Sequence, residues 1–481
     1  MDESNNKNIL SPELLRPLPL DKYFCPAAIW VSNYLKKIQN SKKRAPVSIA
    51  IIKDEENTLV HNTSIITGEH CFEQESLYYI EQIVKTLLWI YGGYKVYIGG
   101  SAAAGEHIKN LYSKKGRRSF DADIMSQIYE RAFEVNYGKL DKTPQAVEKS
   151  AKIGRHLDGC RIGFDLGASD RKVSAVIDGK PVFSEEVVWN PGQQPDPEYH
   201  YNEIMSMLRQ AAAHMPRVDA IGGSSAGIYI NNRVMIASLF RSVPRILFEE
   251  KVKNLFLRVQ KEWNVPLTII NDGEVTALAG SMSLGKNAVL GISMGSSEAG
   301  GYVNKNGGFN PWINELAFVP VDFNQAAAKD EWSGDTGCGV QYFSQQAVIR
   351  LANSAGIEME TGLTPAQKLS FVQEIMKKKD YRAEKIFTTI GSYFGYALAY
   401  YSIFYKIETV LVLGRVTSGE GGMIILNEAK KILKKEFPEL YDSISINLPD
   451  EKNRRVGQSI AAASLPQLKN QGSENGRPLY L

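Results

Sequence analysis

Histidine and cysteine are scarce in this chain of 481 residues, and their positions exclude two kinds of site. The chain has six histidines, none of them after His214. A GxSxG segment at 223–227 matches the nucleophile elbow of α/β-hydrolases, but that fold takes its catalytic histidine from a later segment, so we do not expect Ser225 to be a nucleophile. The four cysteines are scattered without a CxxC pair, which predicts reduced thiols in a cytoplasmic protein.

A strong charge excess and a long hydrophobic run are also missing. The formal net charge is only +3, so we expect neither a nucleic-acid nor a membrane partner. The most apolar stretch, 390–405, contains serine, glycine and several tyrosines, and it predicts a buried helix instead of a membrane span. The composition, 43% hydrophobic and 23% charged, is typical of a soluble globular protein, and the length predicts two or three domains.

Two widespread nucleotide-binding loops are absent as well. The chain has no Walker loop and no GxGxxG segment that leads into a helix. Glycine and serine instead form two turns between expected strands, at 167–171 and 295–298. Such turns offer backbone N–H groups and hydroxyls to phosphate oxygens. We therefore predict phosphate contacts from Gly167, Ala168, Ser169, Lys172, Gly295, Ser296 and Ser297.

The two turns belong to a repeated design that predicts two related lobes. In each lobe a strand, a Gly/Ser turn and a return strand precede a hairpin turn, Asp178-Gly179 in the first and Asn306-Gly307 in the second. A weaker likeness between the helix–strand segments that end near residues 100 and 415 is better explained by chance. The expected domains are an N-terminal α/β domain with its linker (1–150), a first lobe (151–285) and a second lobe (286–481) whose last helix returns to the first.

Two acidic residues stand where a phosphate-binding site needs them. Asp165 ends the strand before the first turn, where a carboxylate can hold Mg²⁺ through water; an exposed strand-end aspartate is the alternative. Asp272 lies between a buried strand and a helix, a position that suits helix N-capping or a general base at the carboxyl end of a strand. As a base, Asp272 would accept the proton of an attacking hydroxyl, and Asn271 would orient the same substrate.

Taken together, these segments resemble the ROK family of bacterial sugar kinases and sugar-responsive repressors, within the actin/hexokinase-like ATPase superfamily. The resemblance covers about residues 160–465. Residues 163–169 and 290–303 look like the two phosphate motifs of the family, and residues 271–279 look like its catalytic segment. Weaker matches lie at 218–227, at 411–416, which resembles the adenosine-side motif, and at 454–463.

The resemblance implies an α/β fold in which two actin/hexokinase-like, ribonuclease H-like lobes enclose a nucleotide cleft. It implies ATP and Mg²⁺ as cofactors and a cytoplasmic bacterial enzyme of carbohydrate metabolism. Under it, Asp272 is the base, Asp165 binds Mg²⁺ through water, and Gly414 and Arg415 contact ATP. The implied substrate contacts are Asn271, Asn314, Glu315 and Gly227.

Departures from the family pattern change two expectations. The family's structural zinc site uses a histidine and a cysteine cluster; here the histidine is Phe318 and only Cys338 remains, so we predict no zinc. A family glutamate that contacts sugar is Val340, which argues against glucose but leaves a sugar or polyol as the substrate. Asp170 and Glu298 add negative charge to the two turns, which Arg171 and Lys172 are expected to offset in the first.

The leading hypothesis is therefore an ATP-dependent kinase that phosphorylates a hydroxyl of a sugar or polyol. The alternative is a non-catalytic sugar or nucleotide sensor with the same fold, and an ATPase without a sugar acceptor is a third hypothesis. The N-terminal domain does not resemble the winged helix-turn-helix of ROK repressors. Three roles stay open for residues 1–150: covering the cleft, extending a lobe or forming a homodimer.

Overall fold

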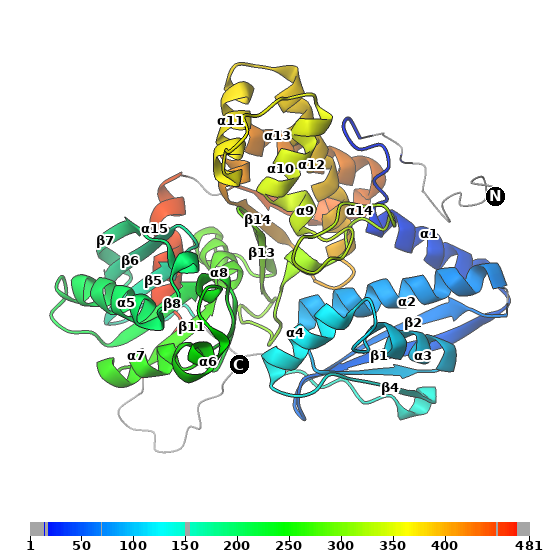
Figure 1. Cartoon of the computed structure of the whole chain (residues 1–481), viewed down its shortest axis with the longest axis horizontal. Coiled ribbons are helices and arrows are strands. Elements are labelled where there is room, and N and C mark those ends of the chain that lie inside the picture. Colours follow the sequence, from blue (N-terminus) through cyan, green and yellow to red (C-terminus); the bar gives the residue numbers. More distant parts are fainter. Residues whose placement is uncertain (1–13, 15–17, 69, 150–153, 449–450, 469–481) are drawn as a thin grey trace.

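Three mixed β-sheets organise the chain (Figure 1), as seen in a computed structural model that describes residues 14, 18–68, 70–149, 154–448 and 451–468. We name the parts built on them the N-terminal region (18–149), the first lobe (154–271) and the second lobe (289–448). The expected α/β class is confirmed, and the structure adds that the sheets are mixed. The predicted domain boundaries stay a prediction.

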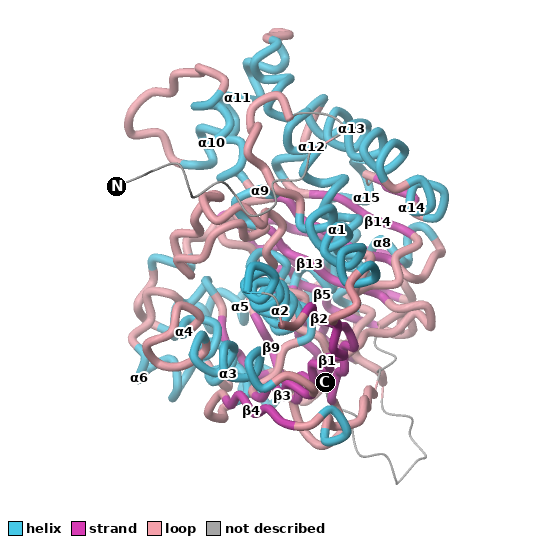
Figure 2. Tube along the Cα trace, turned by 90° about the vertical axis from the view of Figure 1, so that its right-hand side faces the viewer, coloured by secondary structure: helices cyan, strands magenta, loops and turns pink. Residues whose placement is uncertain are grey.

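The sheet of the N-terminal region has the order β2-β1-β3-β4, in which only β3 and β4 are parallel. Helices α1 and α2 lie between this sheet and the helices of the second lobe (Figures 1 and 2). The elements are α1 (Ala27–Asn40), β1 (Arg44–Ile52), β2 (Thr58–Ile66), α2 (His70–Tyr91), β3 (Lys95–Gly99), α3 (Ala102–Leu111), α4 (Ser119–Tyr129) and β4 (Glu134–Gly138).

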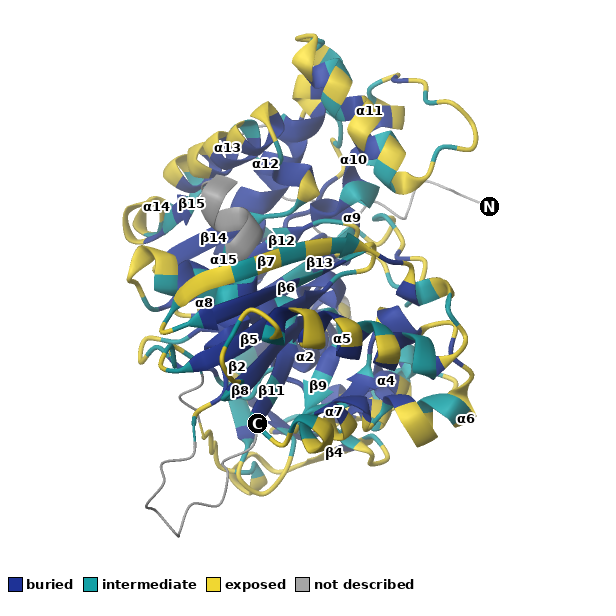
Figure 3. Ribbon diagram, turned by 90° about the vertical axis from the view of Figure 1, so that its left-hand side faces the viewer, coloured by how far each residue is buried: buried dark blue, intermediate teal, exposed yellow. Residues whose placement is uncertain are grey.

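The sheet of the first lobe has the order β11-β8-β5-β6-β7, and β5, β8 and β11 are parallel. Figure 3 shows its inner strands buried and β7 exposed at the edge. A separate hairpin of β9 (Ile228–Ile230) and β10 (Arg233–Ile236) precedes the short helix α6 (Arg245–Leu247). The other elements are β5 (Cys160–Leu166), β6 (Asp170–Ile177), β7 (Lys180–Val188), α5 (Pro197–Ala212), β8 (Ala220–Ser225), α7 (Leu255–Trp263) and β11 (Leu267–Asn271).

The second lobe repeats the central part of this pattern in the order β13-β12-β14-β15, with an antiparallel hairpin followed by parallel strands. The apolar stretch near residue 390 lies in the buried helix α12, as predicted. The elements are β12 (Val289–Met294), β13 (Glu298–Val303), α9 (Val340–Phe343), α10 (Gln345–Ser354), α11 (Pro365–Lys377), α12 (Tyr381–Tyr401), β14 (Thr409–Leu413), α13 (Glu420–Glu436), α14 (Pro438–Ser443) and β15 (Ser445–Asn447).

Two helices cross between the lobes. Helix α8 (Asp272–Leu284) follows the last strand of the first lobe but packs on β12 and β13 of the second. Helix α15 (Glu451–Ala463) follows the second lobe but packs on β5 and β8 of the first. Glycine makes this second contact close, because a Cβ on Gly163 or Gly222 would lie 1.7 Å from a backbone carbonyl oxygen of α15.

The apolar cores divide the molecule differently from the sheets. The N-terminal region and the second lobe share one continuous core, which includes Trp89 and Phe318 and is also reached by Ile228 and Met235 of the first-lobe hairpin. The first lobe has its own core around Phe164 and Leu208. A small third core joins α8 and α15 to β12 and β14. No helix in the described part of the chain is long and apolar enough to cross a membrane.

Strand β2 is continuous, and the linker at the end of the N-terminal region contacts it through paired backbone bonds between Thr58 and Val147. The weak likeness between the N-terminal region and the second lobe does not extend to topology, because β3 is antiparallel to β1 whereas β14 is parallel to β12.

Candidate functional site

Asp165 and Asp272 lie at the same edge of the first-lobe sheet. Asp165 is on β5, and Asp272 opens α8 directly after β11, so both stand near the carboxyl ends of parallel strands. The hydroxyl of Ser224, on β8 between them, donates to Asp165 Oδ1 over 2.6 Å. Burial first, and the nearby charge of Asp165 second, raise the pKa of Asp272 to about 7. Burial also raises the pKa of Asp165.

The helix cap at this edge is Asn271, and not Asp272. Asn271 Oδ1 accepts the backbone N–H of Gly273 over 2.7 Å, and Asn271 Nδ2 donates 2.7 Å to the carbonyl of Gly227. Asp272 Oδ1 accepts a longer bond, 3.0 Å, from the same N–H of Gly273. The predicted substrate residues Asn271 and Gly227 therefore bind each other. Asp272, which is half-buried, is free of the capping role.

The two Gly/Ser turns have exposed tips. Within the described residues, no hydrogen bond engages the backbone N–H groups of Ala168, Ser169, Ser296 or Ser297, and all four residues are exposed. Gly295 lies in open space, because a Cβ there would have only one neighbour within 4 Å, at 3.8 Å. Exposed N–H groups on a tight turn can bind an anion such as a phosphate oxygen.

Arg415 connects the adenosine-side segment to the first turn. Its guanidinium donates to Ser169 Oγ over 3.1 Å and lies 3.5 Å from Asp170. Lys172 is 3.4 Å from the same carboxylate. Gly414 allows this arrangement, since a Cβ there would lie 2.2 Å from the carbonyl oxygen of Met294, next to the second turn.

Two charged residues near the turns do not behave as the sequence suggested. Arg171 does not offset Asp170, because its guanidinium pairs with Glu203 at 2.6 Å. Glu298 does not face the second turn: it is buried and accepts the hydroxyl of Tyr401 over 3.3 Å. From its position on β13, the side chain of Glu298 lies in the interior, where burial raises its pKa to about 8.

The predicted substrate residues Asn314 and Glu315 lie next to the start of α8, the segment that resembles the catalytic segment of the ROK family. Asn314 is buried, accepts the hydroxyl of Tyr405 over 2.9 Å and contacts Glu274 at 3.5 Å. Glu315 is half-buried, and burial, Asp272 and Glu274 together raise its pKa to about 8. Asn314 thus supports Glu274, whereas Glu315 shares the electrostatic environment of Asp272.

Sequence reasoning missed Glu274 and Lys53. Burial raises the pKa of Glu274 to about 8, and the ammonium of Lys53, from the N-terminal region, opposes this increase. Burial lowers the pKa of Lys53 to about 7. Glu274 could have been found by its place two residues after Asp272. No sequence signal connects Lys53 to this site, because the two segments are far apart in the chain.

The segment where the ROK family carries its zinc ligands is filled differently here. Phe318 stacks on Trp89 of α2 with ring centroids 4.2 Å apart, and Cys338 is a buried free thiol. Among the described residues, no group of three or more His, Cys, Asp or Glu could hold a metal ion. The predicted absence of zinc stays a prediction.

No protein-family model matches this chain, and no curated protein matches its sequence. Solved structures match it in fold. A ROK family glucokinase from Streptomyces griseus, in complex with glucose and AMPPNP, aligns at 19% identity and a TM-score of 0.50, over 64% of this chain and 99% of its own. A ROK family transcriptional regulator, a homologue of the E. coli MLC protein, aligns at 17% identity and a TM-score of 0.52, over 64% of this chain and 78% of its own.

These matches confirm the predicted distant structural similarity to ROK sugar kinases and regulators. About 64% of the chain has a ROK/hexokinase-like fold, and the rest is additional to the glucokinase, almost all of which is covered. At such low identities the similarity shows the fold alone. One neighbour is an enzyme and the other a regulator, so the fold does not choose between the two activities.

Proposed function

We propose that this protein is an ATP- and Mg²⁺-dependent kinase that phosphorylates a hydroxyl of a sugar or related polyol. The observation that carries the proposal is the carboxylate pair at one sheet edge, in which Asp165 helps to raise the pKa of Asp272 to about 7. A carboxylate that titrates near neutral pH suits a general base, because it is partly ionised and accepts a proton readily.

The residues around the two turns fit a bound ATP. The free N–H groups of Ala168, Ser169, Ser296 and Ser297 would bind phosphate oxygens, and Arg415 would add positive charge. Asp165 would hold Mg²⁺ through water, and the ion would neutralise charge on the phosphates when bound. Closure of the two lobes would exclude water from the site.

The acceptor hydroxyl would lie against Asp272 and Glu315. Phosphoryl transfer needs an acceptor held in line with the phosphate and a group that takes its proton. Glu315 would orient the acceptor by hydrogen bonding, and Asp272 would take the proton. The loss of the family glutamate at Val340 supports a sugar or polyol with a different hydroxyl pattern from glucose.

A non-catalytic sensor is the second candidate function, and Asp170 is the observation that favours it. Its carboxylate pairs with Arg415 and Lys172, the two side chains that would otherwise bind phosphate. If these contacts persist with nucleotide present, ATP binding is weak and transfer is slow. A structural neighbour that is a transcriptional regulator agrees with this alternative in fold only.

A binding screen followed by a transfer assay separates the two functions. Thermal shifts against a panel of sugars and polyols, with and without Mg-ATP, identify the acceptors that bind. We then expect ADP and a phosphorylated product with the wild type. Asp272→Asn should lower transfer by roughly 10²–10⁴-fold with little change in the Mg-ATP shift.

Asp219→Asn is the matched control, because Asp219 lies at the opposite end of the same sheet and binds the backbone of Cys160. This variant should keep its transfer rate. Near-normal turnover by Asp272→Asn would contradict the proposal. A wild type that binds both a sugar and Mg-ATP but yields no product would support the sensor.

A further inference from the structure

The backbone of the acceptor-side segment, residues 313–338, is attached to the end of helix α2. The N–H groups of Ile313 and Asn314 donate to the carbonyl of Ile90 over 3.1 and 3.0 Å. The N–H of Glu315 donates to the carbonyl of Trp89 over 2.9 Å. The last carbonyls of a helix have no partner inside the helix. The N-terminal region thus fixes the backbone of the two predicted substrate residues, Asn314 and Glu315.

An aromatic contact continues the attachment three residues later. Phe318 stacks on Trp89 at 4.2 Å, and both rings are buried in the core that the N-terminal region shares with the second lobe. The orientation of the Trp89 ring is also fixed, because its Nε1 donates to Asp121 over 2.9 Å. Trp89 therefore holds the segment, and Asp121 of α4 fixes Trp89.

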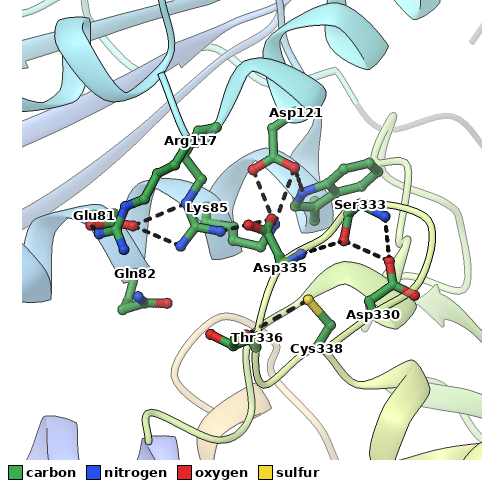
Figure 4. Close-up of polar contacts among 12 residues, drawn as sticks. Glu81, Gln82, Lys85, Arg117, Asp121, Asp330, Ser333, Asp335, Thr336 and Cys338 are labelled. Carbon is green, nitrogen blue, oxygen red and sulfur yellow. Dashed lines mark hydrogen bonds and ion pairs between the residues drawn. The ribbon is translucent and has the colours of Figure 1, made fainter. Parts of the chain in front are cut away.

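A buried ion cluster fixes the far end of the segment (Figure 4). Asp335 lies 2.5 Å from Lys85 Nζ and 2.8 Å from Arg118, and Lys85 also contacts Asp121 at 3.0 Å. Arg118 in turn binds Glu81 at 2.8 Å. Only Asp335 comes from the second lobe; the other four side chains belong to α2, α4 and the loop before α4.

The cluster is nearly closed to water. Lys85, Asp121 and Glu81 are fully buried, and Asp335 is 11% exposed. Burial alone would raise the pKa of Asp335, but Lys85 and Arg118 outweigh it and leave this pKa below its usual value. Buried ion pairs contribute little net stability, and their best-supported use is to select one geometry over others. We therefore attribute to Asp335 a positional effect on the segment.

The ion cluster is connected back to the acceptor residues by backbone pairing. The N–H of Val321 donates to the carbonyl of Gly337 over 2.8 Å. The N–H of Gly339 donates to the carbonyl of Val319 over 2.9 Å. The chain just after Asp335 thus pairs with the residues that follow Phe318. Both ends of the segment are fastened to the N-terminal region.

We propose that the N-terminal region positions the acceptor side of the site, and that Asp335 is the positioning residue that locks segment 313–338 onto α2 and α4. The locking depends on no assumption about activity. Its consequence for an acceptor rests on the proposed function, in which Glu315 contacts the substrate.

Amide hydrogen exchange of the full chain tests the locking without any ligand. In Asp335→Asn, the amides of residues 313–315 should exchange roughly tenfold faster or more, because the segment opens locally from α2. Leu208→Ala, in the separate core of the first lobe, is the control for general destabilisation. It should leave exchange at 313–315 unchanged and speed exchange within α5.

A second variant keeps the test decisive if Asp335→Asn does not fold. Phe318→Leu keeps an apolar side chain but removes the stack on Trp89, so it should speed exchange at 313–315 by a smaller factor. Asp335→Glu, which restores the charge, should recover much of the protection. Unchanged exchange at 313–315 in both Asp335→Asn and Phe318→Leu would overturn the proposal.

Kinetics separate this proposal from the proposed function. With an acceptor from the screen, Asp335→Asn should raise the acceptor KM at least about fivefold while the KM for Mg-ATP changes less than twofold. Equal changes in both constants would show a general structural defect and contradict positioning. If the wild type transfers no phosphate, the proposed function fails, while the exchange result still decides whether the N-terminal region locks the segment.

Discussion

The first lobe and the N-terminal region both contact the second lobe, but the two junctions differ in kind. The first lobe keeps its own apolar core and is joined to the second lobe through α8, α15 and the exposed Arg415. It touches the N-terminal region only locally, where Ile228 and Met235 reach the large core and Glu130 pairs with Arg233 and Lys253 at half-exposed positions. The N-terminal region shares a continuous core and a buried ion cluster with the second lobe. A junction made of helices and an exposed ion pair can open, whereas a shared core cannot open without exposing apolar surface. We therefore expect nucleotide-driven closure between the lobes, with the N-terminal region moving as part of the second.

Removal of the N-terminal region should have the largest effect on the fold. A chain that begins at Gly154 would expose the apolar face on which α1 and α2 pack. We expect it to aggregate and to yield no monodisperse folded protein, as measured by size-exclusion chromatography and circular dichroism. A folded, stable 154–481 fragment would show that the N-terminal region is an appendage.

Trp89→Ala tests the shared core in the full chain. Trp89 is 1% exposed, and its loss should cost about 3–5 kcal/mol of unfolding free energy in urea denaturation. Hydrogen exchange should show opening in the N-terminal region and in the second lobe together. Leu208→Ala, at about 2–5 kcal/mol, should open only the first lobe. Opening confined to the N-terminal region in Trp89→Ala would contradict a shared core.

Glu298→Gln tests whether a buried carboxylate of the second lobe destabilises the fold when it is ionised. Glu298 Oε2 has no hydrogen-bond partner among the described residues, whereas Asp165 has Ser224. Burial raises the pKa of Glu298 from 4.5 to about 8, so the folded chain keeps a proton that the unfolded chain has lost between these pH values. The fold is therefore destabilised as pH rises through this window, with the full cost above about 8.

The substitution should raise stability by about 1–3 kcal/mol at pH 9 and by much less at pH 5, as measured by urea denaturation at both values. A gain of equal size at both pH values would mean that packing, and not ionisation, explains the effect. Glu203→Gln, a half-exposed carboxylate of the first lobe, is a control that should show no such rise at high pH.

Arg415→Ala should have the smallest effect on the fold, because Arg415 is 60% exposed and its contacts cross the junction that can open. We expect unfolding free energy to change by less than about 1 kcal/mol. Mg-ATP binding, measured by calorimetry, should weaken roughly threefold to tenfold. Unchanged binding would show that Asp170 keeps Arg415 from the nucleotide and would favour the sensor.

The parts of the fold that depend on neighbouring residues could be predicted from the sequence. Asp178 and Gly179 both adopt positive φ in the hairpin turn that their dipeptide predicts. The buried helix predicted within 390–405 followed from the apolar composition, and it corresponds to the second half of α12, which ends at Tyr401. The segments around Asp165 and Asp272 were recognised as ends of strands, and they lie at one edge of the sheet.

The parts that depend on distant residues could not be predicted. Strand direction is one example, since nothing in β1 or β3 indicates that they pair antiparallel. Lys85 and Asp335 are 250 positions apart, and each alone is indistinguishable from a surface charge. Arg171 is another case, because alternation along β6 does not reveal that Glu203 of α5 captures its guanidinium. The roles assigned to the site residues stay predictions.

The pH dependence of phosphoryl transfer tests the central claim most directly. With Asp272 as the general base, kcat/KM for the acceptor should rise with pH along a limb of unit slope and level off near pH 7, because the pKa of Asp272 is about 7 and the base must lose its proton. A rate that is constant between pH 5.5 and 8.5, or that falls as pH rises through 7, would contradict Asp272 as the general base.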